Sequence, residues 1–215
     1  MNHMPLSRPN GRSPRLAVWL LAAAAATTLP GCAPLLVGGA MVGTAMVAVD
    51  RRTAGAQFED QAIELKAANR IADLRNNGHV NVTSYNRMVL LTGEVGSEAD
   101  RAAVQAAVEK VENVRTVVNE LAVMGNSSLT ARGNDSVLSG KVKATFVDAG
   151  DMKATAVKVV TERGTVYLMG RVTEREAARA AQLASHVSGV QKVVRVFEIL
   201  TEAELAQIQP QPAKK

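Results

Sequence analysis

From about residue 56 onward, one pattern of apolar and polar positions occurs twice along the chain. An offset of 77 places the apolar run at 89–95 on the run at 166–172, and the two runs align position by position. After Gly96 the offset is 76, and the valine spacing of 111–118 then recurs at 187–194. A period of this length is that of a domain rather than of a solenoid repeat. The pattern therefore predicts two copies of one folded unit.

Within each copy the pattern predicts a helix, two strands, a second helix and a last strand. In the second copy, the polar residues 134–136 are expected to cap a helix. That helix carries an apolar stripe of Val137, Leu138, Val142 and Phe146. Two β-branched runs, 157–161 and 165–172, are separated by Arg163-Gly164, which is typical of a hairpin turn. Thr173-x-x-Glu176 then matches a capping box at the start of the second helix.

These elements predict an α+β fold in which two helices cover one face of a three-stranded sheet. Each copy holds a full set of apolar helices and strands, and the joining stretch 124–133 is polar and contains glycine. We therefore expect two independent cores.

The first part of the chain has the pattern of a targeting segment. Basic residues at 8, 12 and 15 precede the uncharged stretch 16–29, which is short for a membrane span and suits a signal sequence. This stretch runs into Leu29-Pro30-Gly31-Cys32, which resembles a bacterial lipobox. We expect a signal peptide at 1–31 and acylation of Cys32; an uncleaved anchor or a buried free cysteine is the alternative. Residues 32–55 are expected to form a Gly/Ala-rich tether whose Arg51-Arg52 marks the exit into water.

The amino-acid composition limits the functions that the chain can have. Aromatic residues make up 3% of the chain, which argues against base stacking and hence against a nucleic-acid partner. One cysteine and three scattered histidines predict no disulfide and no metal site. We found no nucleophile motif and no phosphate-binding loop, and His79 and His186 are expected to be solvated. The sequence thus predicts a protein that is not an enzyme, with no catalytic residue and no cofactor.

Charge divides unequally between the copies. Residues 50–124 carry a net charge of −2, whereas residues 125–215 carry +4, which suggests that the second copy faces an anionic partner. On its first helix, apolar and small residues adjoin two lysines, a combination suited to a phospholipid interface. The candidate lipid-binding residues are Val137, Leu138, Ser139, Gly140, Lys141 and Lys143. From charge alone, an ordinary core helix with a solvated basic edge explains the pattern better.

The second copy also resembles a known family. Its segments Val172-Thr173-Glu174-Arg175-Glu176 and Ser188-Gly189-Val190, within residues 157–194, resemble a BON domain. Two such units after a lipobox are similar to the dual-BON outer-membrane lipoproteins of Gram-negative bacteria. The resemblance implies BON domains at 56–125 and 133–202, each an αββαβ unit with a three-stranded mixed sheet on two helices. Residues 203–215 would lie outside it as a disordered tail.

Membership would also imply a location and a role. The protein would be held by its lipid anchor in the inner leaflet of the outer membrane and face the periplasm. It would bind anionic phospholipids, mainly through the second domain, and support outer-membrane integrity. The alternative is an adaptor that binds an envelope protein, as part of outer-membrane assembly or cell-wall remodelling machinery. Salt-sensitive binding to vesicles would favour the first, and salt-insensitive capture of one protein partner the second.

Overall fold

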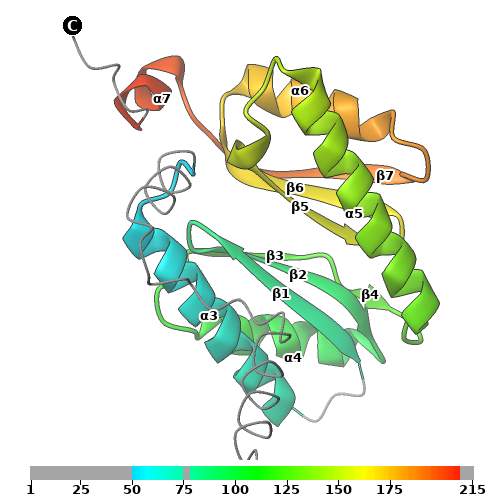
Figure 1. Cartoon of the computed structure of the whole chain (residues 1–215). Coiled ribbons are helices and arrows are strands. Elements are labelled where there is room, and N and C mark those ends of the chain that lie inside the picture. Colours follow the sequence, from blue (N-terminus) through cyan, green and yellow to red (C-terminus); the bar gives the residue numbers. More distant parts are fainter. Residues whose placement is uncertain (1–49, 75–77, 209–215) are drawn as a thin grey trace, which may run out of the picture. The chain divides into compact units, whose positions relative to one another are not determined.

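The computed structural model describes residues 50–74 and 78–208. The first repeat follows the expected order of elements (Figure 1), which are α3 (Ala54–Asp73), β1 (His79–Tyr85), β2 (Met88–Val95), α4 (Glu98–Glu109), β3 (Thr116–Asn119) and β4 (Ala122–Val123). The second repeat adds a 3-10 turn, and its elements are α5 (Leu129–Ala149), η1 (Ala154–Ala156), β5 (Val157–Glu162), β6 (Thr165–Val172), α6 (Glu174–Ser185) and β7 (Lys192–Ile199). The predicted mixed α+β fold with two tandem units is confirmed.

In each repeat the second strand is the centre of the sheet. β2 pairs antiparallel with β1 and parallel with β3 and β4, which form one edge interrupted at residues 120–121. β6 likewise pairs antiparallel with β5 and parallel with β7. A parallel neighbour requires a crossover connection, and α4 and α6 supply it. The two helices of each repeat lie on one face of its sheet (Figure 1).

A buried aspartate on the first helix holds the hairpin turn in both repeats. Both central residues of each turn have positive φ, with Arg163 at 50° and Gly164 at 71° in the second repeat. Asp135 accepts hydrogen bonds from their backbone N–H groups at 2.7 and 2.8 Å. Asp60 does the same for the Asn86-Arg87 turn at 2.7 and 2.8 Å. Burial raises the pKa of Asp60, but these bonds, with others from Ser84 and Arg52, outweigh it and hold the pKa below its usual value.

The helix starts confirm one expectation and correct another. The predicted capping box of α6 is present, because Thr173 and the Glu176 side chain each accept from the other's backbone N–H. The expected cap at residues 134–136 is wrong: α5 begins at Leu129, and the Ser128 hydroxyl accepts from the N–H of Ala131. Asp135 therefore lies inside the helix, where its carboxylate is the turn clamp rather than a cap.

Each repeat has an apolar core between its helices and its sheet. In the first repeat the core is centred on Ile63, Ala67, Val89, Leu91, Val104 and Val108. In the second it is centred on Val142, Phe146, Val159, Val166, Leu168 and Ala180. Side chains alternate along a strand, so every second residue points away from these helices.

The expectation of fully independent cores is wrong, because the second face of each sheet is also buried. A third apolar cluster joins the repeats and contains Tyr85, Leu90, Tyr167, Met169 and Val196. Polar contacts surround it: Asn86 Nδ2 donates to Glu198 Oε2 at 2.6 Å, and Lys158 Nζ lies 3.0 Å from Glu64 Oε1. The two sheets thus pack on each other through the faces that their own helices leave uncovered.

Two expectations at the ends of the described region are also corrected. Arg51 does not mark an exit into water, because its side chain is 4% exposed and forms two 2.7 Å bonds with the Glu176 carboxylate. Residues 203–208 are not disordered, because they belong to α7 (Glu202–Ile208). Leu205 of this helix is buried, and Thr201 and Glu204 cap its start reciprocally. Residues 209–215 lie outside the described residues.

Candidate functional site

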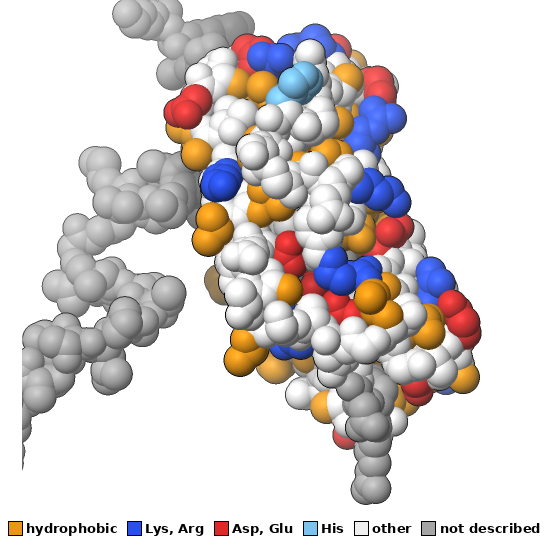
Figure 2. Space-filling view, turned by 90° about the vertical axis from the view of Figure 1, so that its right-hand side faces the viewer, with side chains coloured by type: hydrophobic (Ala, Val, Ile, Leu, Met, Phe, Trp, Pro, Cys, Tyr) orange, Lys and Arg blue, Asp and Glu red, His pale blue; other side chains and the backbone are white. Residues whose placement is uncertain are grey.

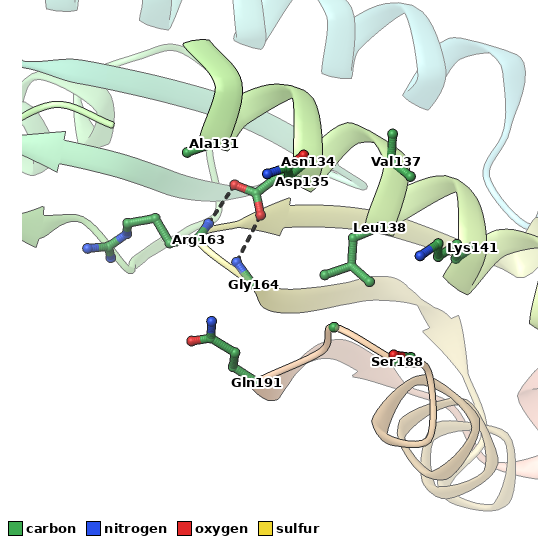
Figure 3. Close-up of a pocket in the computed structure, with 11 residues that line it drawn as sticks. Ala131, Asn134, Asp135, Val137, Leu138, Lys141, Arg163, Gly164, Ser188 and Gln191 are labelled. Carbon is green, nitrogen blue, oxygen red and sulfur yellow. Dashed lines mark hydrogen bonds between the residues drawn. The ribbon is translucent and has the colours of Figure 1, made fainter. Parts of the chain in front are cut away.

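An open hollow lies beside α5, between this helix, the β5–β6 turn and the loop after α6 (Figure 3). Its volume is about 540 Å³. The helix contributes one wall, formed by Ala131, Asn134, Asp135, Val137, Leu138 and Lys141. The other wall is formed by Arg163, Gly164, Ser188, Gly189 and Gln191. We call this feature the α5 hollow.

The walls of the α5 hollow are held by contacts that the fold requires. Asp135 ties the helix to the β5–β6 turn through its two backbone hydrogen bonds (Figure 3). Gly189 has φ +102°, a conformation that L side chains rarely adopt. A Cβ at this position would lie 3.5 Å from Leu138 Cδ1, so the loop closely approaches the helix. The hollow is thus a built part of the second repeat.

The structure separates the predicted site residues into four groups. Val137 and Lys141 line the α5 hollow and are exposed, Val137 by 60%. Leu138 also lines it but is only 7% exposed, so its side chain contributes to the packed interior. Ser139 points elsewhere, since its hydroxyl donates to Thr161 Oγ1 at 2.8 Å.

Two predicted residues lie away from the hollow. Gly140 and Lys143 are exposed on α5 but do not line it. Residues 141 and 143 are two positions apart on a helix, and such residues do not share a face. Only one of the two predicted lysines therefore borders the hollow.

The sequence argument missed the wall opposite the helix. Ser188, Gly189 and Gln191 follow α6, and Arg163 lies at the hairpin turn. The motif Ser188-Gly189-Val190 supplied part of the family resemblance, but nothing in its composition indicated that it faces α5. Positive φ at Gly189 is the physical reason that a glycine stands there.

Apolar and basic side chains occur together on the surface of α5. Its large exposed apolar residues are Leu129, Val137 and Val147. Figure 2, viewed from the side on which α5 lies in Figure 1, shows orange, blue and red side chains interspersed on this face. Lys141 brings positive charge to the α5 hollow, whereas the Arg163 side chain points away from it toward Glu94 (Figure 3), and the Asp135 carboxylate is occupied by the turn. Such a surface can hold an anionic group next to hydrocarbon.

Comparison with known proteins identifies both repeats. A family model described as the BON domain matches residues 59–125 and 134–201. The chain is 41% identical over 175 residues to "Outer membrane lipoprotein DolP" of Haemophilus influenzae, covering 80% of this chain and 90% of that protein. It is 32% identical over 152 residues to "21 kDa hemolysin" of Actinobacillus pleuropneumoniae, covering 69% and 78%. It is 28% identical over 141 residues to "Osmotically-inducible protein Y" of Escherichia coli, covering 63% and 70%.

These matches bear on location as well as on fold. The expected outer-membrane location agrees with the name of the Haemophilus influenzae relative. Within residues 50–74 and 78–208, no helix is both long enough and apolar enough to cross a membrane. Cys32 lies outside the described residues, so its acylation stays a prediction.

Proposed function

Because the chain belongs to the BON-domain family, we propose that it is an outer-membrane lipoprotein that binds anionic phospholipid through its second BON domain. The lipid anchor at Cys32 would hold it on the inner leaflet, facing the periplasm, and its role would be to support envelope integrity. None of the three relatives compared above carries the name of an enzyme, and we propose a binding function without catalysis.

The observation that carries the proposal is the pairing of exposed Val137 with Lys141 at the α5 hollow. A valine that is 60% exposed can enter the acyl boundary of a bilayer, while an ammonium group next to it meets phosphate. The net charge of +4 over residues 125–215 attracts the same surface. The first repeat, with a net charge of −2 over residues 50–124, has no such attraction.

The expected energies are small, which suits a protein that is already anchored. One lysine near an anionic surface contributes about 1 kcal/mol. A few such contacts give weak binding by themselves. Acyl chains on Cys32 would keep the domain at the membrane, so weak binding becomes effective through a high local lipid concentration.

Vesicle binding of the mature chain without its anchor (residues 32–215 with Cys32→Ser) tests the charge contribution. Lys141→Glu replaces attraction by repulsion and should weaken binding to phosphatidylglycerol vesicles by roughly 30-fold at low salt, since about 2 kcal/mol is lost. The matched control is Lys153→Glu, which changes the charge of the same repeat equally at an exposed residue that does not line the hollow. Equal losses for the two variants would mean that only net charge matters and that α5 is not the site.

A second variant tests the apolar contribution. Val137→Asp should weaken binding at high salt as well, because it removes apolar area from the interface and adds a charge. Val137 is the suitable position because Leu138 is buried, so that Leu138→Asp would disturb folding instead. Circular dichroism confirms the fold of each variant. If folded Val137→Asp binds vesicles like the parent at high salt, insertion by this helix is refuted.

The adaptor function remains a second proposal because of α3 in the first repeat. Phe58 and Leu65 on this helix are largely exposed, and they are separated by seven residues and so lie on one face. The adjacent Glu59 and Glu64 are paired with Arg87 and Lys158. The exposed apolar pair, on a repeat with a net charge of −2, therefore suits a protein partner better than an anionic bilayer. Phe58→Ala with Leu65→Ala should then abolish salt-insensitive capture of that partner and leave vesicle binding unchanged.

A further inference from the structure

Three side chains that are distant in sequence meet where the two repeats join. His79 begins β1, and Glu94 is its register partner near the end of β2. Glu162 ends β5 in the second repeat. One ligand atom from each of the three lies within 4.8 Å of the other two. The histidine expected to be solvated is thus part of a cross-repeat cluster with two carboxylates.

The cluster is buried and only partly satisfied. Glu94 has an exposed fraction of 0% and Glu162 one of 4%. Glu94 Oε2 accepts from the backbone N–H and hydroxyl of Ser127, both at 3.2 Å, but Oε1 has no hydrogen-bond partner among the described residues. His79 Nδ1 is also buried without a hydrogen bond within the described part of the chain, at 3.5 Å from Glu94 Oε2. Glu94 Oε1 and His79 Nδ1 are therefore both buried in this cluster without a hydrogen bond from the described residues.

Protein groups compensate this negative charge incompletely. Asn81 Nδ2 donates to Glu162 Oε2 at 2.9 Å, but an amide carries no net charge. Arg163 Nε lies 3.6 Å from Glu94 Oε1, which is an ion-pair distance without a hydrogen bond. Two buried carboxylates near each other destabilise the folded state unless a proton or a cation lies between them.

We propose that His79, Glu94 and Glu162 form a site for a divalent transition-metal cation, with Zn²⁺ as the ion best suited to it. Imidazole nitrogen with two carboxylate oxygens is a ligand set that Zn²⁺ accepts, whereas Mg²⁺ and Ca²⁺ prefer oxygen alone. Zinc bonds of roughly 2.0–2.2 Å require the three side chains to draw together from their present spacing. An adjoining hollow of about 240 Å³, lined by His79 and Glu162, gives the ion and a fourth ligand such as water a path from solvent.

The position of the site gives it a structural consequence. His79 and Glu94 belong to the first repeat and Glu162 to the second. A bound ion would therefore link the repeats at the edge of their shared apolar cluster. Because a ligand that binds only the folded chain stabilises it by mass action, the ion should raise the temperature of unfolding.

Zinc titration of the tag-free mature chain (residues 32–215 with Cys32→Ser), in competition with a chromophoric chelator, tests the proposal. We expect one Zn²⁺ per chain and a higher unfolding temperature with the ion. His79→Gln, Glu94→Gln and Glu162→Gln should each weaken binding more than tenfold, since even outer-shell changes cost 10–100-fold. His186→Gln is the matched control, because it alters the other histidine of the mature chain and should leave the affinity unchanged.

A gain-of-affinity variant keeps the test valid if a ligand variant does not fold. Arg163→Asn removes the competing guanidinium, and asparagine tolerates the positive φ of this turn position. It should tighten Zn²⁺ binding severalfold, and an unchanged or weaker affinity would overturn the proposal. The proposal would also be overturned if the parent chain bound no Zn²⁺ even when the ion is in excess, or if a folded His79→Gln variant bound Zn²⁺ like the parent. Loss of binding in His79→Gln but full affinity in Glu162→Gln would overturn the cross-repeat site.

Discussion

Protonation of one buried carboxylate should determine much of the acid sensitivity of the described unit. The Arg51 guanidinium, bonded to Glu176 through two 2.7 Å contacts, lowers the pKa of this glutamate from 4.5 to about 2, although burial opposes the shift. Hydrogen bonds from Thr173 add to the effect. The pKa of Glu176 is thus about 2.5 lower in the folded than in the unfolded chain, and at about 1.4 kcal/mol for each pH unit this contributes about 3 kcal/mol to the free energy of unfolding.

The direction follows from the lowered pKa. Folding favours the ionised carboxylate, so the contribution is fully present above the unfolded pKa near 4.5 and is lost as the pH falls toward about 2. Glu176→Gln should therefore lower the free energy of unfolding by about 3 kcal/mol at neutral pH and by little near pH 2. Removing one partner of a buried ion pair costs about 3–5 kcal/mol in general, which agrees with this magnitude.

Urea unfolding followed by circular dichroism between pH 2 and pH 7 measures this difference. The matched control is Glu174→Gln, because Glu174 also lies in the first turn of α6 but is exposed, and its ion pair is with exposed Arg195. An exposed pair contributes at most about 1 kcal/mol, so this variant should stay close to the parent. If Glu176→Gln and the parent differ by the same amount at every pH, the coupling to Arg51 is refuted.

Three further expectations test the rest of the structure. Met169→Ala should lower the free energy of unfolding by about 2–5 kcal/mol, since Met169 lies in the apolar cluster between the sheets. Amide protection against hydrogen exchange should fall in both repeats, and a loss confined to the second repeat would contradict a shared core. Asp135→Asn should lower the free energy of unfolding by about 1–3 kcal/mol, because the two N–H groups of the turn donate to the two carboxylate oxygens and an amide has only one oxygen. Hydrogen exchange at residues 163 and 164 should then be faster. Mass spectrometry of the membrane-extracted protein should show an acylated Cys32 as its first residue, and an intact Met1 would contradict this.

Local signals made the architecture predictable. The hairpin at Arg163-Gly164 and the capping box at Thr173 and Glu176 each depend on residues close in sequence, and the structure has both. The start of α5 was mispredicted because asparagine, aspartate and serine, which occupy positions 134–136, are among the residues most frequent at helix N-caps. Asp135 instead bonds the turn 28 residues later, and no local pattern indicates such a contact.

The shared core between the repeats was predictable in principle. The run Val89-Leu90-Leu91 is apolar at successive positions, and a strand that is buried on one face should alternate instead. Leu90 is completely buried against the second repeat, which explains why the alternation is broken. Tyr167-Leu168-Met169 has the same continuous pattern in β6.

The candidate site was predictable only where helical spacing decided it. Leu138, Val142 and Phe146 are four residues apart, so one stripe places all three inside and turns Val137 and Lys141 toward solvent. Leu138 was nevertheless also predicted as a lipid-binding residue, and its burial makes that part of the prediction wrong. The opposite wall, with Gln191 and the Arg163 turn, comes from segments whose proximity to α5 depends on the whole fold.

The position of Arg51 connects the anchor with the proposed lipid-binding domain. Arg51 precedes the first repeat in sequence, yet its side chain bonds Glu176 and the carbonyl of Arg171 in the second. Nineteen peptide units separate it from Cys32, and such a segment spans at most about 65 Å when fully extended. An anchor at Cys32 would thus join the folded unit where the two domains meet, because Arg51 bonds Glu176 of the second domain and Arg52 pairs with Asp60 of the first. The second domain, which carries the positive excess, therefore contacts the segment that leads from the anchor, and Glu176→Gln should loosen this contact as well as the fold.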